Sequence, residues 1–368
     1  MATYGFISEL LRESDIACDW QPRGAVAAFY SQADFDRALD KFDRSRVDAP
    51  EIVDHLQVVG PNSTAPSLGD LGVGKAKGAI INTMAASLWP YKLVARIVQD
   101  QVQERADFSL HTNTPVTSLE TATGDADGPW RVCTPRGSCI ARHVLLATNG
   151  YTSHLLPNMR DVIEPVRGNM IAGRGGGDLL LNHSYGLVDE LSGDEHKDLI
   201  RVSERLIGDG EYLMQRPAER GAAGLGTIAE SPVLALGGAR FMMPNSGYGL
   251  SNDDRLDPEA NKFLRGRLAQ VLDAVAAEPE TFKVTHEWTG ILGYSKDGFP
   301  WVGELREGLW LCAGYSGHGM PQAALCATSV ASMILDRLAG HDRDLSKDRG
   351  VLPSRFMITP ERLKAHGL

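Results

Sequence analysis

A glycine-rich loop near the end of the chain has the residue types and spacing to hold an anionic or electron-rich partner. Leu309 to Ala313 is an apolar run typical of a buried strand, and glycines follow at 314, 317 and 319. Pro321 suits the first turn of a helix, so Gln322 to Leu338 is predicted to be helical. A strand, a glycine loop and a helix N-terminus together direct several N–H groups at one ligand. The same spacing also suits a plain tight turn, and both interpretations stay open.

The segment from Trp288 to Gly303, together with this loop, resembles the C-terminal flavin-binding signature of the D-amino-acid oxidase (DAO) superfamily of FAD-dependent oxidoreductases. Within it, the similarity is greatest to the fungal and bacterial branch that includes gamma-glutamylputrescine-type oxidases. The resemblance extends over most of the chain and implies that the loop lies against a flavin ring. The residues it implies as flavin neighbours are Gly314, Tyr315, Ser316, Gly317, His318, Gly319 and Met320.

Two further segments are implied as cofactor neighbours by the same resemblance. Val116 would contact the adenine side of FAD through its backbone. An apolar strand from Val144 ends in a stretch that would close over the pyrophosphate, namely Ala147, Thr148, Asn149 and Gly150. Taken without the resemblance, an apolar strand before Asn-Gly is equally a strand and a turn.

The family reaction moves a hydride from the carbon that bears nitrogen to the flavin, and O₂ usually reoxidises the flavin. Tyr294 is the expected catalytic residue, as a hydroxyl in the substrate pocket, and Tyr248 and Trp288 are expected to line that pocket, although each could be a core aromatic. His318 is interpreted as a hydrogen-bond donor within its loop rather than as a base. No metal site is expected, since the cofactor carries the difficult step.

Two residues differ from those of sarcosine-type relatives, and they bear on how FAD is attached and on which substrate is expected. Leu292 stands where those relatives have the cysteine that binds FAD covalently, so FAD is expected to be non-covalent. Pro321 stands where they have a lysine that holds the substrate carboxylate. An amine or a secondary-metabolite intermediate is therefore favoured over a simple amino acid.

The strand, G-x-G-x-x-G turn and helix that grip the FAD pyrophosphate in this family have no counterpart in the sequence. The nearest candidates, Gly72, Gly74 and Gly78, have the wrong spacing. Weak FAD binding is therefore expected for the isolated chain. The alternative function is that of a truncated, catalytically inactive relative that acts as a binding or partner subunit.

Composition excludes other classes of function. The net charge of −10 without a basic cluster argues against a nucleic-acid surface. The five cysteines form no C-x-x-C pair, which indicates reduced thiols. No long apolar stretch indicates a membrane span, and a cytoplasmic protein is expected.

The expected fold class is α/β, with an incomplete Rossmann-like FAD domain that carries a β-meander and a mixed α+β substrate domain. The substrate domain would begin in residues 1–91 and continue in 166–287. The FAD domain would comprise residues 92–165 and 288–340, followed by a tail at 341–368.

Local patterns predict the elements of these domains. Strands are expected at Gly24–Tyr30, Gly78–Asn82, Phe108–Leu110, Val116–Glu120, Trp130–Thr134, Ile140–Ala147, Tyr212–Pro217, Leu234–Arg240 and Phe282–Trp288, with helices at Met1–Ser14, Gln32–Phe42, Lys92–Arg105 and Lys262–Ala277 and a loop region at Leu56–Leu71. Ile163–Met170 resembles the family's crossover from the nucleotide domain into the substrate domain. Ser31 is a predicted helix cap. Arg167 is expected to be solvated, and Lys296 and Asp297 to form a solvated pair.

Overall fold

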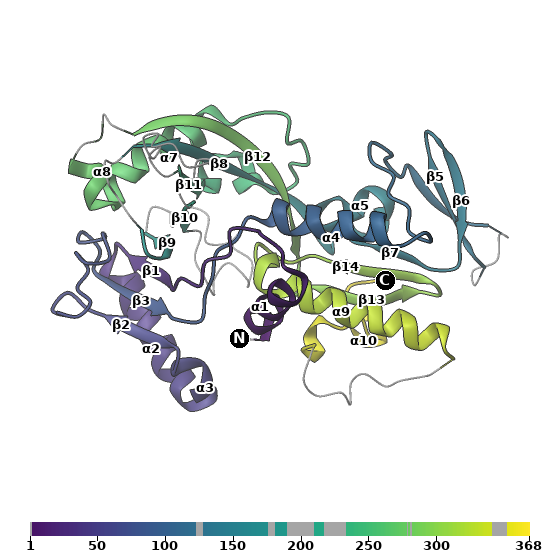
Figure 1. The fold of residues 1–368 in the computed structure, drawn as a ribbon, viewed down its shortest axis with the longest axis horizontal. Helices are drawn as coiled ribbons and strands as arrows, with labels where there is room; N and C mark the ends of the chain where they lie inside the picture. The colour runs from purple at the N-terminus through teal and green to yellow at the C-terminus, as the bar shows by residue number, and fades with distance from the viewer. Residues whose placement is uncertain are drawn as a thin grey trace.

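A computed structural model describes residues 2–122, 128–175, 181–189, 210–216, 233–277, 279, 282–340 and 352–368. Figure 1 shows two lobes, one around a large sheet and one around two small sheets and the helices α4 and α9. Two long strands connect the lobes. The mixed α/β architecture agrees with the predicted fold class.

The large sheet contains eight strands in the order β12-β8-β11-β10-β9-β1-β3-β2. They are β1 (Ala25–Phe29), β2 (Leu56–Val59), β3 (Gly78–Asn82), β8 (Ile163–Arg174), β9 (Ser184–Val188), β10 (Glu211–Gln215), β11 (Val233–Gly238) and β12 (Lys283–Ser295). β1 and β9 pair in parallel, and the other neighbours are antiparallel. Strands from the first 91 residues therefore share one sheet with strands from the middle of the chain.

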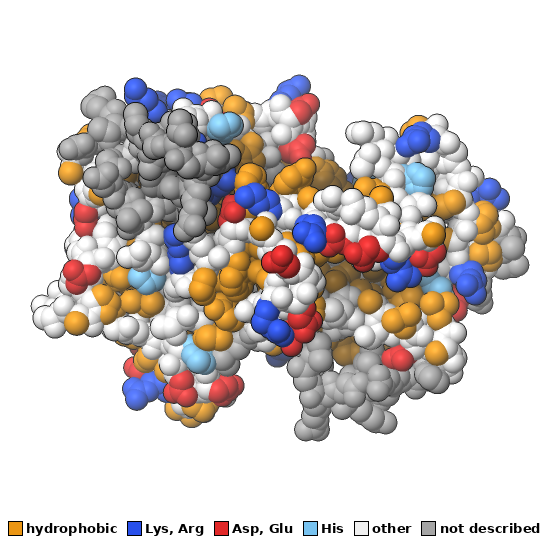
Figure 2. Space-filling model, viewed as in Figure 1, with side chains coloured by type: hydrophobic (Ala, Val, Ile, Leu, Met, Phe, Trp, Pro, Cys, Tyr) orange, Lys and Arg blue, Asp and Glu red, His pale blue; other side chains and the backbone are white. Residues whose placement is uncertain are grey.

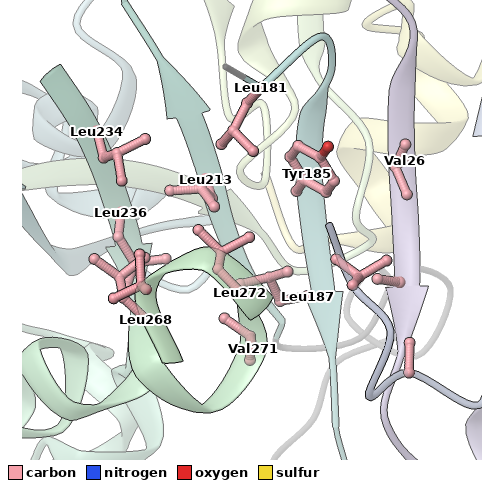
Figure 3. Packing of buried hydrophobic residues seen from close by; sticks show 14 of the residues in the cluster. Val26, Leu181, Tyr185, Leu187, Leu213, Leu234, Leu236, Leu268, Val271 and Leu272 are labelled. Carbon is pink, nitrogen blue, oxygen red and sulfur yellow. The ribbon is translucent and has the colours of Figure 1, made fainter. Parts of the chain in front are cut away.

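The core of this lobe lies between the sheet and the helix α7. Leucines on β9, β10 and β11 and the end of α7 point toward one another in Figure 3. Leu187, Leu213 and Leu236 are at most 1% exposed, as is Leu268 of α7. Burial of a leucine side chain contributes roughly 1.5–3 kcal/mol, so this cluster is a main source of stability for the lobe.

The second lobe contains two three-stranded sheets. One has the order β13-β14-β7 and the other β4-β5-β6. The strands are β4 (Ser118–Thr121), β5 (Trp130–Thr134), β6 (Gly137–Ala141), β7 (Val144–Leu146), β13 (Trp301–Arg306) and β14 (Leu309–Ala313). β14 is the central strand of its sheet and is buried along its whole length, as its apolar run predicts.

The predicted helices are present with shifted ends, but Lys262–Ala277 is broken at Leu272 into two helices, and three short helices were not predicted. The described helices are α1 (Ala2–Ser14), α2 (Gln32–Asp48), α3 (Pro50–Val53), α4 (Pro90–Glu104), α5 (Thr152–Leu155), α7 (Pro258–Val271), α8 (Asp273–Ala277), α9 (Gly319–Leu338) and α10 (Pro360–Ala365). The Ser31 side chain accepts a hydrogen bond from the Asp34 N–H and caps α2, as predicted. None of the described helices is long and apolar enough to cross a lipid bilayer.

β8 and β12 carry the connection between the lobes. They pair along 163–174 and 283–295, with Glu164 opposite Tyr294 and Val166 opposite Leu292. β12 extends beyond the predicted strand Phe282–Trp288, because the glycines that follow Trp288 read as breaks, and β8 lies where the sequence indicates only a crossover between the domains. Residues 165 and 287, where the expected domains meet, lie inside these continuous strands.

Three predicted elements are wrong. Leu56–Leu71 is not all loop, because β2 at its start pairs with β3. Phe108–Leu110 is not a strand: Phe108 and Leu110 are 38% and 53% exposed. The predicted strand Ile140–Ala147 is two strands in different sheets, β6 and β7. The break falls at Arg142 and His143, and the His143 ring accepts a hydrogen bond from the Trp310 indole at 3.2 Å.

β7 is an edge strand of its sheet, and its exposure is unusual. The Leu145 side chain is 42% exposed in the middle of an apolar run. Figure 2 shows further hydrophobic side chains on the face that carries α4 and α9. Those exposed include Tyr91, Val94 and Val102 of α4 and Leu335 and Leu338 of α9. An apolar edge strand of this kind is a template for another strand.

Candidate active site

The glycine loop between β14 and α9 has a backbone that only small residues adopt without strain. Gly314 and Gly317 both have φ of +80°, and Ser316 between them has φ of +50°. A Cβ on Gly317 would lie 2.8 Å from the Tyr294 hydroxyl oxygen. Glycine at 317 is therefore required both by the backbone conformation and by the closeness of this tyrosine.

Hydrogen bonds attach the loop to the end of β12. The Ser316 N–H donates to the Gly293 carbonyl at 2.7 Å, and the Ser295 N–H donates to the Ser316 hydroxyl at 3.1 Å. Tyr294 and Tyr315 form an isolated antiparallel bridge. These contacts hold the predicted catalytic residue Tyr294 beside the loop.

Tyr294 is part of an aromatic and cationic group. Its ring meets that of Tyr248 edge to face at 5.5 Å, and the Arg240 guanidinium lies 4.9 Å from the Tyr294 ring centroid and 5.8 Å from that of Tyr248. Both tyrosines are nearly buried, at 6% and 7% exposure. The structure thus brings together two of the predicted substrate residues. Arg240 was missed, since a single arginine after two glycines carries no sequence signal.

Asn149 joins the end of β7 to the glycine loop. Its side-chain oxygen accepts a hydrogen bond from the Gly314 N–H at 3.0 Å. A Cβ on the neighbouring Gly150 would lie 2.4 Å from the Leu292 carbonyl oxygen. Asn149 therefore lies against the loop and Gly150 against β12, and the Asn149 side chain has a structural partner; contact of residues 147–150 with a cofactor stays a prediction. Thr148 likewise shares a hydrogen bond with the Thr152 hydroxyl at 3.0 Å.

The N-terminus of α9 follows the loop directly. His318 is its N-cap residue but provides no side-chain cap. The His318 Nδ1 instead lies 2.8 Å from the Ser316 carbonyl oxygen, which agrees with the predicted role inside the loop. The first N–H groups of α9, at Gly319 and Met320, are thus left without a capping side chain, and Met320 is 62% exposed. An uncapped helix N-terminus attracts an electron-rich group.

Tyr315 points into the core rather than toward a ligand. Its hydroxyl lies 3.0 Å from the Cys312 thiol, beside the buried Cys326. Burial raises the pKa of Tyr315 and of Cys312 and raises the pKa of Cys326 to about 12. All three groups are neutral at pH 7, so this cluster anchors the loop and supplies no nucleophile.

Two predicted site residues lie elsewhere. Val116 precedes β4, whose sheet is at the far end of the second lobe from β12 (Figure 1). Trp288 is on β12, roughly 20 Å along the strand from Tyr294 at 3.3 Å per residue. It is 42% exposed and pairs with Met170. Trp288 is therefore not brought to the glycine loop. Val116 is expected at the adenine side of FAD rather than at the loop, and that contact stays a prediction.

Two expectations about charged residues near the site are wrong. The Arg167 side chain is only 11% exposed, its guanidinium donates to the Asn252 carbonyl at 3.2 Å, and it lies 4.0 Å from Asp257. Asp297 does not pair with Lys296. It accepts two hydrogen bonds from Arg362 of α10, at 3.0 and 3.1 Å. Both side chains thus hold loops and helices in place.

A cleft of about 940 Å³ lies next to these residues, at the ends of β7, β8 and β12. Of the predicted site residues it is lined by Gly150 alone. Its other walls include Tyr151, Glu164 and Lys296. Glu164 lines the cleft and is the cross-strand partner of Tyr294. The cleft is therefore adjacent to the predicted catalytic residue.

A strand, a glycine loop and an uncapped helix N-terminus thus lie against the end of a long strand of the large mixed sheet, an arrangement that can hold an anionic or electron-rich group. The DAO family model of FAD-dependent oxidoreductases matches residues 1–333. The chain therefore belongs to the DAO family of FAD-dependent oxidoreductases, as the resemblance implied.

Solved structures show the same fold. Glycine oxidase from Geobacillus kaustophilus superposes with a TM-score of 0.69 at 15% identity, over 98% of this chain and 81% of that one. Iminodiacetate oxidase from Chelativorans sp. BNC1 superposes with a TM-score of 0.66 at 14% identity, over 97% and 82%.

A probable oxidoreductase, OrdL, from Rhizobium meliloti (strain 1021) is 22% identical over 283 residues. The match covers 77% of this chain and 54% of the relative, so the chain spans about half the length of that protein.

The residues present fit the part of FAD that carries the ring. The α9 N-terminus provides N–H donors without a capping side chain, and Met320 in its first turn is exposed, as an electron-rich edge of the ring requires. Among the described residues, no group of three or more His, Cys, Asp or Glu side chains could hold a metal ion.

Proposed function

We infer that this chain carries the flavin-ring and substrate side of an FAD-dependent oxidase that breaks a C–H bond next to the nitrogen of an amine. The observation that carries this proposal is the position of Tyr294 between the glycine loop and the Arg240–Tyr248 pair. Bound FAD would supply the acceptor for the hydride, with O₂ as the final oxidant. We assign residues 92–165 and 288–340 to the flavin part and 1–91 and 166–287 to the substrate part of this cytoplasmic enzyme.

The chain's own residues would bind and orient the two reactants. Gly314, Gly317 and the α9 N-terminus would hold the electron-rich edge of the flavin ring, and the Tyr294 hydroxyl would orient the substrate nitrogen. Tyr294 is nearly buried, so water would be excluded from the reacting groups. Leu292 packs beside Val166, Tyr248 and Tyr294, and it has no nucleophilic atom, which supports non-covalent FAD.

An amine substrate is supported by the chemistry of the site and by the proteins it resembles. Two similar structures are named as oxidases of glycine and of iminodiacetate, both of which carry an amine nitrogen. Pro321 provides no charge for a carboxylate beside the loop. The proposed substrate is therefore an amine or an amino-acid-like molecule. If the substrate has a carboxylate, the glycine loop does not bind it.

The test is titration of the purified chain with FAD, followed by absorbance spectra and then by acid precipitation. We expect weak binding, with all flavin released into the supernatant. Gly317→Val should abolish binding, because the side chain would meet the Tyr294 hydroxyl and the φ is positive. Gly266→Ala on α7 is the control, since a Cβ added at Gly266 would have no atom within 4 Å. Flavin that stays with the precipitate, or Gly317→Val binding as tightly as the wild type, would refute the proposal.

Tyr294→Phe tests the proposed role of the hydroxyl in the flavin-loaded chain. The rate of anaerobic flavin bleaching by an amine substrate should fall about 10²-fold, as for loss of a positioned proton-handling group. FAD affinity should stay unchanged, because the ring remains. An unchanged bleaching rate would exclude Tyr294 from the reaction.

The second candidate function is a non-catalytic binding or partner subunit. The exposed edge of β7, with Leu145 in its centre, supports it, since such an edge takes another strand. A chain that binds no FAD at any concentration, yet forms a stable complex through this edge, would favour this function over catalysis.

A further inference from the structure

One face of the β8–β12 ladder, which joins the two lobes (Figure 1), is interrupted by a gap without side chains. Side chains alternate between the two faces of a strand, so every second residue of β12 from Trp288 to Tyr294 lies on the same face. Within this row Gly290 pairs with Gly168 of β8. A Cβ added at Gly290 would have no atom within 4 Å, so the space above this pair is open. We call it the glycine slot.

Large apolar side chains close the two ends of the glycine slot. At one end Trp288 pairs with Met170, and at the other end Leu292 pairs with Val166. Side chains directly opposite each other on one face of a sheet lie about 5 Å apart, so each pair forms an apolar wall. Leu292 packs on the buried Val166, whereas Trp288 is 42% exposed. The two walls are four residues apart along β12, roughly 13 Å at 3.3 Å per residue.

Tyr212 of β10 extends the wall at the Trp288 end. Met170 pairs with Gly237 of β11, and Gly237 pairs with Tyr212. Because Gly237 has no side chain, the Tyr212 hydroxyl reaches across it and donates a hydrogen bond to the Met170 sulfur at 2.7 Å. Tyr212 is still 55% exposed, so two aromatic side chains present open surface at this end of the slot.

The chemistry of the slot favours a flat, uncharged group. Its floor and walls consist of the pairs Gly290–Gly168, Trp288–Met170 and Leu292–Val166, which carry no ionisable side chain. A floor of bare backbone accepts the face of a planar ring. Aromatic side chains and methionine sulfur both make favourable contacts with an aromatic ring, with the sulfur often at the ring edge.

We propose that the glycine slot binds a planar aromatic ring of the substrate, at the end remote from the reacting nitrogen. This assignment rests on the proposed function, because Tyr294 would orient that nitrogen. Tyr294 is four residues from Gly290 along β12, roughly 13 Å at 3.3 Å per residue. Leu292 lies between them on the same face, so an apolar linker joins the two ends of the ligand. The substrate class is thus an arylalkylamine with an extended linker.

The test is calorimetric titration of the full chain, without FAD, with 6-phenylhexylamine. Hexylamine, which lacks the ring, and 6-cyclohexylhexylamine, which has a puckered ring, are the comparison ligands. We expect 6-phenylhexylamine to bind at least about tenfold more tightly than hexylamine, because a buried phenyl group contributes roughly 1.5–3 kcal/mol. It should also bind more tightly than the cyclohexyl compound. Equal binding of either comparison ligand would overturn the proposal.

A substitution that fills the slot locates the binding. Gly290→Leu should weaken binding of 6-phenylhexylamine about tenfold and leave hexylamine binding unchanged. Gly186→Leu is the matched control: Gly186 pairs with Tyr212 from β9, on the same face of the sheet, and a Cβ there also has no atom within 4 Å. Unchanged affinity in Gly290→Leu would overturn the proposal. If circular dichroism shows that this variant is not folded, Trp288→Ala replaces it, with the same expected loss.

Two further readouts separate the alternatives. Light scattering should give the same mass for the wild type and Gly290→Leu, and a lower mass for the variant would assign the slot to a second copy of the chain and overturn the proposal. Without ring binding, flavin that hexylamine still bleaches would overturn the slot alone. Ring binding by a flavin-loaded chain that no amine bleaches would support the slot and overturn the proposed function.

Discussion

A buried arginine on α7 illustrates how single residues stabilise the large lobe. The Arg267 side chain is 3% exposed and binds Glu211 at 3.0 Å and Asp189 at 3.1 Å. Burial raises the pKa of Glu211, and the adjacent guanidinium opposes that shift. Three charges thus depend on one another inside the sheet–helix interface.

Arg267→Met should therefore be strongly destabilising. Removal of one partner leaves buried carboxylates uncompensated, and we expect a loss of about 3–5 kcal/mol in the free energy of unfolding. Urea denaturation followed by circular dichroism measures it. Arg265→Met, on the same helix, breaks a pair with Glu287 in which Arg265 is 55% exposed. It should cost at most about 1 kcal/mol. Similar losses for both variants would contradict the prediction.

His183 should make stability depend on pH. Burial, and then the nearby Arg23, lower the pKa of His183 below its usual 6.5. The unfolded chain therefore takes up a proton at a higher pH than the folded chain does. The contribution of His183 is complete above pH 6.5 and is lost as the pH falls from there through the lowered pKa of the folded state.

His183→Gln should flatten this dependence. The urea midpoint of the wild type should fall more steeply between pH 7.5 and pH 5.5 than that of the variant. His286→Gln is a control, since His286 is exposed on β12. Parallel curves for the wild type and His183→Gln would show that His183 does not titrate differently on folding.

At the scale of elements, β7 has an edge that is unpaired among the described strands. β14 covers one side of β7, and no described strand covers the other. The apolar run that predicts this strand is typical of a central parallel strand, buried on both faces. The apolar sequence of β7 thus predicts more burial than the described residues give this strand.

Leu145→Lys should reduce self-association of the purified chain, because a charged residue on an exposed edge disfavours strand pairing. Size-exclusion chromatography with light scattering measures it. Leu335→Lys is the matched control: Leu335 is 65% exposed but lies on a helix. Equal loss of association in both variants would mean that general hydrophobicity, rather than the strand edge, causes it.

At the scale of the whole molecule, β8 and β12 run from one lobe into the other, so we expect the two lobes to unfold together. Their ladder begins in the large sheet and ends at the glycine loop, where Gly314 packs near Ile163 and Ser295. Unfolding either lobe would thus leave half of this ladder without its packing partners.

Calorimetry should show one unfolding transition. Leu213→Ala in the large lobe and Leu311→Ala in β14 each remove a buried side chain, at a cost of about 2–5 kcal/mol. Both should lower the Tm of that single transition. Two transitions, each shifted by only one of the substitutions, would show that the lobes unfold independently.

Local patterns were sufficient for the elements that depend on nearby residues. The buried strand at 309–313, the Ser31 cap and the strands around Leu213 and Leu236 were predicted because strand burial and capping are short-range effects. The break between β6 and β7 was not predicted, because it depends on which of the two small sheets each half of the apolar run pairs with. The same holds for β2, whose partner strand lies about twenty residues away.

The sequence by itself determined the family and the glycine loop, because the signature residues are local and the glycines at 314 and 317 are needed where the backbone takes a positive φ. Only the tertiary structure decided what surrounds Tyr294. Arg240, Tyr248 and Glu164 come from three separate segments, and no local spacing connects them. Their meeting depends on the register of β8 and β12, which is established by packing across the whole sheet.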